Sequence, residues 1–223
     1  MTFDPYPRLV LGRGVALIAP LARRLELLER AGITDTLVVP FTREVAAMAP
    51  EEWAEQMLRP IGTRRVVVGE GFRFGARAAG DATTLRRLGF VVDEVRLAGG
   101  ASSTRVRQLV AAGELTAAAR LLGRPVEIEG APSPGSGSSR LQLAVDSGMS
   151  VPPSGTYAGQ ALGLPVLAVV VGDGQVELRS ARRLPEHPPP RVCVHLPRDA
   201  VVPAGIGAHG PQTQTLTSPR KAS

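Results

Sequence analysis

Residues 65–75 have the sequence Arg-Val-Val-Val-Gly-Glu-Gly-Phe-Arg-Phe-Gly. The run Val66-Val67-Val68 has the length and the β-branched composition of a buried strand. The three glycines that follow allow positive φ angles and the close approach of a ligand to the backbone. An ordinary strand-to-helix loop with its aromatic rings in the core is the alternative, and local sequence alone favours it.

Segments typical of strands and of helices alternate on both sides of this stretch. We expect strands at 2–4, 36–39 and 90–95, and helices at 21–32, from residue 50 to about 58, and at 83–88, 104–111 and 115–122. Such alternation predicts an α/β fold with a parallel sheet covered by helices on both faces. In these sheets, ligands bind beyond the carboxyl ends of the strands.

The composition changes after Pro125. Residues 130–139 are almost purely glycine, proline, serine and alanine, which predicts a flexible linker over 126–139. Residues 140–202 contain short β segments separated by glycine and proline, and no clear helix. We therefore expect an α/β domain over 1–125, a reduced, mainly β domain over 140–202, and a disordered tail over 203–223.

The overall composition limits the possible partners. The net charge is 26 − 20 = +6, but only 4% of the residues are aromatic and no basic run alternates with aromatics, so we expect no nucleic-acid partner. The longest apolar stretch, Pro165–Val171, is too short to cross a bilayer, and residues 1–20 lack the pattern of a signal peptide. Cys193 is the single cysteine, so no disulfide forms within the chain. These features predict a soluble cytoplasmic protein without a membrane partner.

The stretch Ala101-Ser102-Ser103-Thr104-Arg105-Val106-Arg107 starts an expected helix after the pair Gly99-Gly100. Free N–H groups and partial positive charge at a helix start suit a phosphate. The hydroxyls of Ser102, Ser103 and Thr104 add donors. Arg105 and Arg107 are two positions apart, so at most one faces the ligand. An ordinary Ser/Thr N-cap is the alternative.

Several segments, in order, resemble one family. They are Thr2–Pro7 (T-F-D-P-Y-P), parts of Phe41–Leu58, Val68–Gly75 with its F-R-F-G, Gly80-Asp81, Ser102–Arg107 (S-S-T-R-V-R) and Leu121–Pro125 (L-L-G-R-P). Together they are similar to the adenylyltransferase half of the bacterial bifunctional riboflavin kinase/FMN adenylyltransferase (FAD synthetase) family. The resemblance covers residues 2–125 almost continuously.

The resemblance implies a Rossmann-like nucleotidyltransferase domain that catalyses ATP + FMN → FAD + pyrophosphate with Mg²⁺. It assigns no metal ligand and no catalytic residue in this chain. Its ligands are small molecules, a nucleotide and a flavin, and the oligomeric state stays open. The implied flavin contacts are Pro5, Pro7 and Phe74. The implied nucleotide contacts are Gly69, Phe72, Arg73, Gly75, Ser102, Ser103, Thr104, Arg105 and Arg107.

The chain departs from the family pattern at several positions. The family's first strand and its G-x-F-D-G-x-H-x-G-H segment are expected before Met1, so the expected sheet lacks that strand. No histidine occurs before His187. Gly71 stands where the family has Asp or Asn, which removes a polar side chain from the expected nucleotide pocket. Tyr6 replaces the histidine between the two prolines.

The second half resembles the family's riboflavin kinase barrel in two places, Pro153–Gly159 (P-S-G-T-Y-A-G) and Val192–Leu196 (V-C-V-H-L). The family's P-T-A-N segment has no counterpart in 138–150. Cys193 occupies the position of the glutamate expected to act as a base, and a neutral thiol does not replace a carboxylate in that role. We therefore expect no riboflavin kinase activity.

Three functions are compatible with this pattern. The first is an FMN adenylyltransferase whose start codon is assigned too late. The second is a catalytically silent paralogue that binds a flavin or an adenine nucleotide, and the third is a scaffold that kept the fold and lost the ligand. Because Gly71 and Cys193 lie inside the chain, a misplaced start does not explain them.

Overall fold

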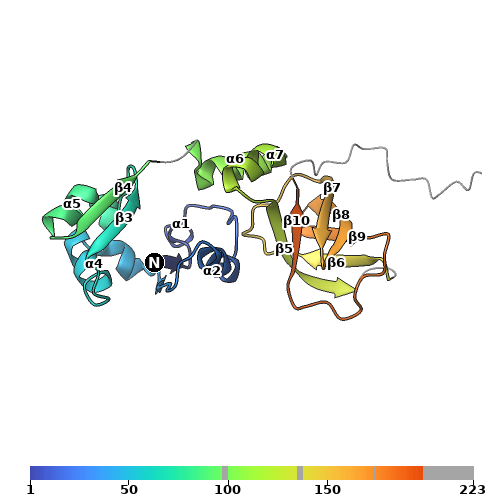
Figure 1. Ribbon diagram of the computed structural model, residues 1–223, viewed down its shortest axis with the longest axis horizontal. Helices are drawn as coiled ribbons and strands as arrows, with labels where there is room; N and C mark the ends of the chain where they lie inside the picture. Colours follow the sequence, from blue (N-terminus) through green and yellow to red (C-terminus); the bar gives the residue numbers. More distant parts are fainter. Residues whose placement is uncertain (97–99, 135–137, 173, 198–223) are drawn as a thin grey trace, which may run out of the picture.

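A computed structural model describes residues 1–96, 100–134, 138–172 and 174–197 of the protein. The predicted tail at 203–223 lies outside these residues. Helices and strands alternate over the first 122 residues, and strands alone follow (Figure 1). The first part comprises β1 (Thr2–Asp4), α1 (Pro7–Val10), α2 (Leu21–Arg30), β2 (Val38–Pro40), α3 (Arg43–Ala47), α4 (Pro50–Met57), β3 (Arg65–Gly69), α5 (Ala82–Arg87), β4 (Val91–Val95), α6 (Ser103–Ala111) and α7 (Leu115–Leu122).

The strands of this first part form two separate parallel pairs. β1 pairs with β2, and β3 pairs with β4 in the register Arg65↔Val91 to Gly69↔Val95. The prediction of parallel strands with helices is confirmed. The two pairs, however, are not hydrogen-bonded into a single sheet among the residues that the structure describes.

Within the part of the chain that the structure describes, helices cover one face of the β3–β4 pair, whereas the sequence predicted cover on both. Val68 and Val92 are buried against a core that contains Trp53 of α4 and Leu85 of α5. On the other face, the side chains of Val67, Val91 and Val95 are 51–64% exposed. The buried side chains of α6 belong instead to the hydrophobic cluster of the barrel.

The second part is a closed barrel with the strand order β10-β5-β6-β9-β8-β7. All its strand pairs are antiparallel. This confirms the predicted mainly β, barrel-like region. Its strands are β5 (Val126–Pro134), β6 (Arg140–Ala144), β7 (Gly155–Ala161), β8 (Leu164–Gly172), β9 (Gln175–Arg179) and β10 (Val192–Leu196).

The predicted linker over 126–139 is wrong for most of its length, because Val126–Pro134 is strand β5. In this strand Val126 and Ile128 point into the barrel core, and Glu127 between them points outward. The glycine- and proline-rich composition does not predict this strand. Pairing with β6 and β10, which are distant in the sequence, stabilises it. Residues 135–137 lie outside the described part.

The core of the barrel extends beyond the barrel strands. Val106, Leu109 and Val110 of α6 and Leu115 and Ala118 of α7 are buried in the same hydrophobic cluster as the barrel strands. A second cluster joins α4, α5, β3 and β4. Figure 1 shows that second cluster at one end of the molecule and the barrel, with α6 and α7 beside it, at the other. Along the chain, the boundary between the two cores therefore lies between β4 and α6, whereas the sequence predicted a domain boundary at residue 125.

Candidate functional site

The loop 69–75 leaves the carboxyl end of β3. Gly69 is the last residue paired with β4, and the Glu70 N–H donates to the Val95 carbonyl across a distance of 2.9 Å. The chain that leads from β4 to α6 starts at this same Val95. Because the strands are parallel, the glycine loop and the segment before α6 leave the β3–β4 pair from one end. This is the end at which parallel sheets bind ligands.

The two phenylalanine rings of the loop differ in exposure. The rings of Phe72 and Phe74 stack at 5.6 Å with an interplanar angle of 15°, and Phe74 also lies 5.2 Å from Trp53. Phe74 is only 7% exposed and belongs to the core of the α/β part. The structure therefore gives Phe74, expected beside the flavin, a packing role. Phe72 is the more accessible ring of the two.

Gly75 packs against the start of α4. Its φ is +70°, and a Cβ built on it would lie 2.9 Å from the backbone of Pro50. The Ala76 N–H donates to the Met48 carbonyl over 2.7 Å. Close packing of backbone on backbone therefore accounts for Gly75 without a ligand. Gly71, with a φ of +75°, has no atom within 4 Å of its Cβ position.

Replacing Gly75 by alanine is expected to destabilise the protein more than replacing Gly71. Both substitutions place a Cβ at positive φ, which costs about 1 kcal/mol. At Gly75 the Cβ also collides with Pro50, and such overpacking costs typically about 1–3 kcal/mol more. Chemical denaturation followed by Trp53 fluorescence measures both changes. Equal losses in the two variants would show that the contact with Pro50 does not constrain Gly75.

The start of α6 has the geometry of an N-cap. The Ser102 hydroxyl oxygen accepts a hydrogen bond from the Arg105 N–H at 3.2 Å, and the Ser102 carbonyl accepts from Val106. Ser103, Thr104 and Arg105 are exposed. The first N–H groups of a helix have no partner within the helix, so those of Ser103 and Thr104 are available to an anion.

The two arginines of this helix have different surroundings. Nε of Arg107 donates to the Ala16 carbonyl at 2.6 Å, and its guanidinium lies 5.9 Å from the centre of the Tyr6 ring. Arg107 thus connects α6 to the segment Pro5-Tyr6-Pro7, which was expected to contact a flavin. Arg105 is exposed and closer to the first turn. It is the better placed of the two to reach a bound phosphate.

Arg73, another expected nucleotide contact, faces a carboxylate. Its guanidinium lies 3.5 Å from Asp81, and its side chain is 57% exposed. Asp81 caps α5, and the hydrogen bond from the Thr84 N–H, with the charge of Arg73, lowers the pKa of its carboxyl. Asp81 therefore stays ionised at neutral pH and offsets part of the positive charge of Arg73.

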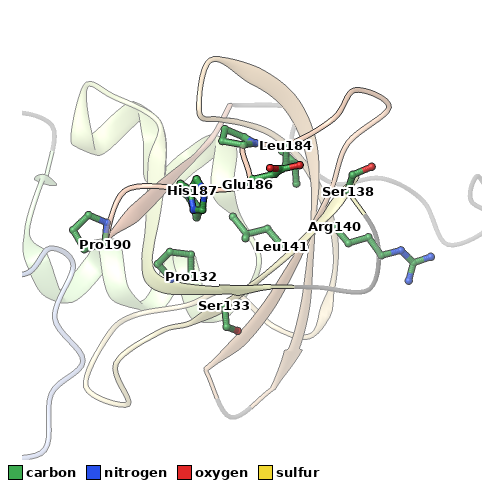
Figure 2. A pocket seen from close by; sticks show the side chains of 11 residues that line it. Pro132, Ser133, Ser138, Arg140, Leu141, Leu184, Glu186, His187 and Pro190 are labelled. Carbon is green, nitrogen blue, oxygen red and sulfur yellow. The ribbon is translucent and has the colours of Figure 1, made fainter.

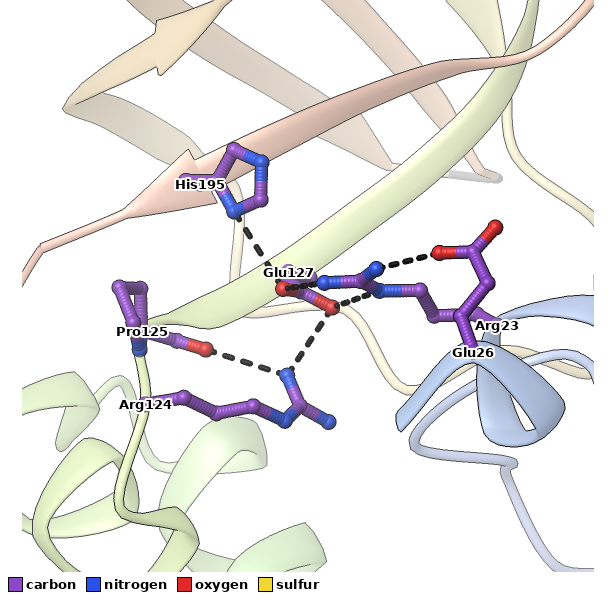
Figure 3. Close-up of polar contacts among 6 residues, drawn as sticks. All are labelled: Arg23, Glu26, Arg124, Pro125, Glu127 and His195. Atoms are coloured by element: carbon purple, nitrogen blue, oxygen red, sulfur yellow. Dashed lines mark hydrogen bonds and ion pairs between the residues drawn. The ribbon is translucent and has the colours of Figure 1, made fainter. Parts of the chain in front are cut away.

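Sequence reasoning missed a charged cluster on the outer face of the barrel (Figure 3). Arg23 of α2 donates to both carboxylate oxygens of Glu127 in β5, at 2.9 and 2.7 Å. Arg124 lies 3.0 Å from Glu127, and Nδ1 of His195 lies 3.3 Å from it. Burial raises the pKa of Glu127, but the Arg23 hydrogen bonds and the neighbouring positive charges outweigh it, so the pKa is lowered. Glu127 is thus an ionised carboxylate whose side chain is only 7% exposed.

A pocket of about 500 Å³ opens at the mouth of the barrel (Figure 2). Prolines and leucines form most of its wall, and serine, arginine, glutamate and histidine side chains also line it. None of the expected nucleotide or flavin contacts lines it. The lining residues are Pro132, Ser133, Ser138, Arg140, Leu141, Leu184, Pro185, Glu186, His187, Pro188 and Pro190.

Comparisons with known proteins agree with the sequence motifs. Residues 1–105 match the model of the family described as FAD synthetase. A putative bifunctional riboflavin kinase/FMN adenylyltransferase from Geobacillus thermodenitrificans is 34% identical over 56% of this chain and 71% of the relative. The chain belongs to the bifunctional riboflavin kinase/FMN adenylyltransferase family.

Other members of the family match a longer part of the chain but a smaller share of their own length. The bifunctional enzymes of Listeria monocytogenes and Bacillus subtilis are each 28% identical, over 71% and 72% of this chain. The chain spans about half the length of these relatives, 55% and 56%. A crystal structure titled as a macrolide-efflux protein from Streptococcus pneumoniae has the same fold, with a TM-score of 0.75 at 21% identity over 89% of this chain and 72% of that one.

Two further observations concern membrane-spanning helices and the barrel residue Cys193. No helix within the described residues is both long and apolar enough to cross a membrane. Cys193, at the position of the family's expected glutamate, lies in β10 two residues before His195, and it is partly exposed. Burial raises the pKa of its thiol to about 12, so at neutral pH the group is a thiol and not a base.

Proposed function

We propose that this protein acts in FAD biosynthesis by binding ATP and FMN at the carboxyl end of the β3–β4 pair for adenylyl transfer, giving FAD and pyrophosphate. The match of residues 1–105 to the FAD synthetase family carries the proposal. The position of two loops also supports it. The glycine loop follows Gly69 and the chain toward α6 follows Val95, and these two residues are paired at the same end of β3 and β4.

In this proposal the start of α6 binds the ATP phosphates. The N–H groups and hydroxyls of Ser103 and Thr104 donate to phosphate oxygens, and the helix end supplies partial positive charge. Arg105 adds a charge-assisted hydrogen bond. Gly69 and Phe72 lie beside the nucleotide, and Arg73, paired with Asp81, contributes positive charge to the same region. Mg²⁺ enters with the ATP and reduces the charge on its phosphates.

The flavin is proposed to lie against the segment 5–7. Pro5 and Pro7 follow the carboxyl end of β1, and Tyr6 lies beside Arg107 of α6. This contact supports the proposal, because it joins the proposed flavin segment to the helix that carries the proposed phosphate site. Phe72 replaces Phe74 as the aromatic side chain available to a ring system, since Phe74 is packed on Trp53.

A second function, nucleotide or flavin binding without turnover, is favoured by one particular observation. Gly71 occupies the position of the family's Asp or Asn, so the loop after β3 lacks a polar side chain at that position. Adenylyl transfer depends on preorganised groups that stabilise charge as it develops. A protein with the binding groups but without that polar side chain would hold its ligands and react slowly.

Incubation of the full chain with FMN, ATP and Mg²⁺ tests the proposal. We expect chromatography to detect FAD above a control without protein, and the Arg105→Ala variant to form FAD more slowly than wild type. FAD at the level of the control, together with a rise in melting temperature on adding ATP or FAD, would reject turnover and support the second function. No FAD and no shift would reject both.

A further inference from the structure

Three side chains of the kind that bind metal ions gather on the outer face of the barrel. Glu127, Cys193 and His195 each offer one ligand atom, and these atoms all lie within 4.8 Å of one another. Cys193 and His195 are two positions apart in β10, so they share a face of the strand. His195 is directly opposite Glu127 of β5 in the strand register. Regular strand geometry therefore fixes all three positions.

The Glu127 carboxylate is held in place by its neighbours (Figure 3). Its Oε2 accepts from Nε of Arg23 at 2.9 Å and faces Arg124 at 3.0 Å. Its Oε1 accepts from Arg23 at 2.7 Å and lies 3.3 Å from Nδ1 of His195. A carboxylate has about four acceptor positions, so Oε1 can exchange its contact with His195 for a bond to a metal while Arg23 stays bound. The arginines thus orient the carboxylate.

The donor types determine the class of metal. Mg²⁺ and Ca²⁺ require several oxygen ligands, and the cluster offers one carboxylate that already faces two guanidinium groups. Any cation is repelled by Arg23 and Arg124, so binding requires a strong bond that a hard cation does not form. A thiolate with an imidazole and a carboxylate is a donor set that Zn²⁺ favours.

We infer that Glu127, Cys193 and His195 bind a thiophilic divalent cation such as Zn²⁺. Three protein ligands leave the fourth tetrahedral position to water. The His195 side chain is 43% exposed, so solvent reaches the cluster. This site is independent of the proposed adenylyl transfer, because its residues come from the barrel.

Binding has a defined proton balance. Coordination forms one metal–sulfur bond, breaks the S–H bond and releases one proton to solvent. His195 binds through an unprotonated ring nitrogen. No group changes its oxidation state.

Titration of the untagged full chain with Co²⁺, followed by displacement with Zn²⁺, tests the inference. Cys193 is the only cysteine in the chain, so a thiolate-to-cobalt charge-transfer band reports this site alone. We expect one Co²⁺ per chain, the band, and its loss when Zn²⁺ is added. Cys193→Ser should remove the band, and His195→Asn should weaken binding about tenfold or more. His187→Asn, at the pocket of Figure 2, is the matched control and should bind as wild type does.

Three further measurements test the inference. Zn²⁺ should raise the melting temperature of wild type and not that of Cys193→Ser, which separates binding from a change in folding. Arg124→Gln should bind Zn²⁺ several times more tightly because one repelling positive charge is gone, and sedimentation shows whether a single chain is enough to bind the metal. Absence of the band, an undiminished affinity in Cys193→Ser, or a metal that binds only when two chains associate in sedimentation would overturn the inference.

Discussion

Replacing Glu127 by glutamine is expected to lower the free energy of unfolding by about 3–5 kcal/mol, the cost of removing one partner from a buried ion pair. Glu127 is 7% exposed, and the Arg23 side chain that donates to it is 10% exposed. The amide removes the buried counter-charge of the Arg23 guanidinium, which then faces only the exposed carboxylate of Glu26. Because Arg23 is in α2 and Glu127 is in β5, the loss should also weaken the contact between α2 and the barrel. Urea denaturation measures it.

Glu26→Gln is the matched control. Glu26 also accepts from Arg23, at 2.5 Å, but its side chain is 55% exposed. Exposed ion pairs contribute about 0–1 kcal/mol, so this variant should be close to wild type. Similar losses in the Glu26 and Glu127 variants would show that burial does not set the strength of the Arg23–Glu127 pair.

The same ion pair gives stability a dependence on pH. The pKa of Glu127 is lower in the folded protein than in the unfolded chain. Its contribution is therefore complete above the unfolded pKa of about 4.3 and is lost as the pH falls through the lower folded value. In Glu127→Gln this part of the acid destabilisation should be absent.

Replacing Leu109 by alanine should cost about 2–5 kcal/mol, because it removes a large buried side chain from a packed core. Leu109 is 3% exposed and belongs to α6, whose buried face shares its cluster with the barrel. The loss should therefore appear in the barrel strands, although α6 follows β4 in the chain. Hydrogen exchange of the β5 and β10 amides should speed up.

The fluorescence of the single tryptophan reports on one of the two cores in this experiment. Trp53 lies in the cluster with β3 and β4, so its fluorescence follows the unfolding of that part. We expect the Trp53 transition of Leu109→Ala to match wild type, and Leu11→Ala, whose side chain is 51% exposed, to change neither signal. A Trp53 transition that shifts together with barrel exchange would show that the two cores unfold as one.

The features that local sequence determines were predicted well. The valine run at 66–68 is β3, and the helix expected at 115–122 has the observed bounds of α7. Prediction was poorer where residues distant in the sequence determine the structure or the packing of a segment. The short helices α1 and α3 were not expected. The side chains of α6 that point inward are apolar whichever sheet they cover, so the sequence did not reveal that they pack on the barrel.

The candidate site divides in the same way. The N-cap at Ser102 and the glycine loop after β3 follow from local patterns. The burial of Phe74 and the contact of Gly75 with Pro50 depend on where α4 packs. The cluster around Glu127 could not be foreseen, because its carboxylate and the Arg23 guanidinium are 104 positions apart in the chain.

Calorimetric titration of the full chain with ATP and Mg²⁺ is the most direct test of a nucleotide site at the start of α6. We predict that wild type binds ATP, that Arg105→Ala binds it at least about tenfold more weakly through loss of a charge-assisted hydrogen bond, and that Arg107→Ala has a smaller effect because Arg107 is engaged with Ala16 and Tyr6. Arg120→Ala, an exposed arginine of α7, is the control and should bind as wild type does. Equal weakening by Arg105→Ala and Arg120→Ala, or no binding of ATP by wild type, would contradict a nucleotide site at this helix start.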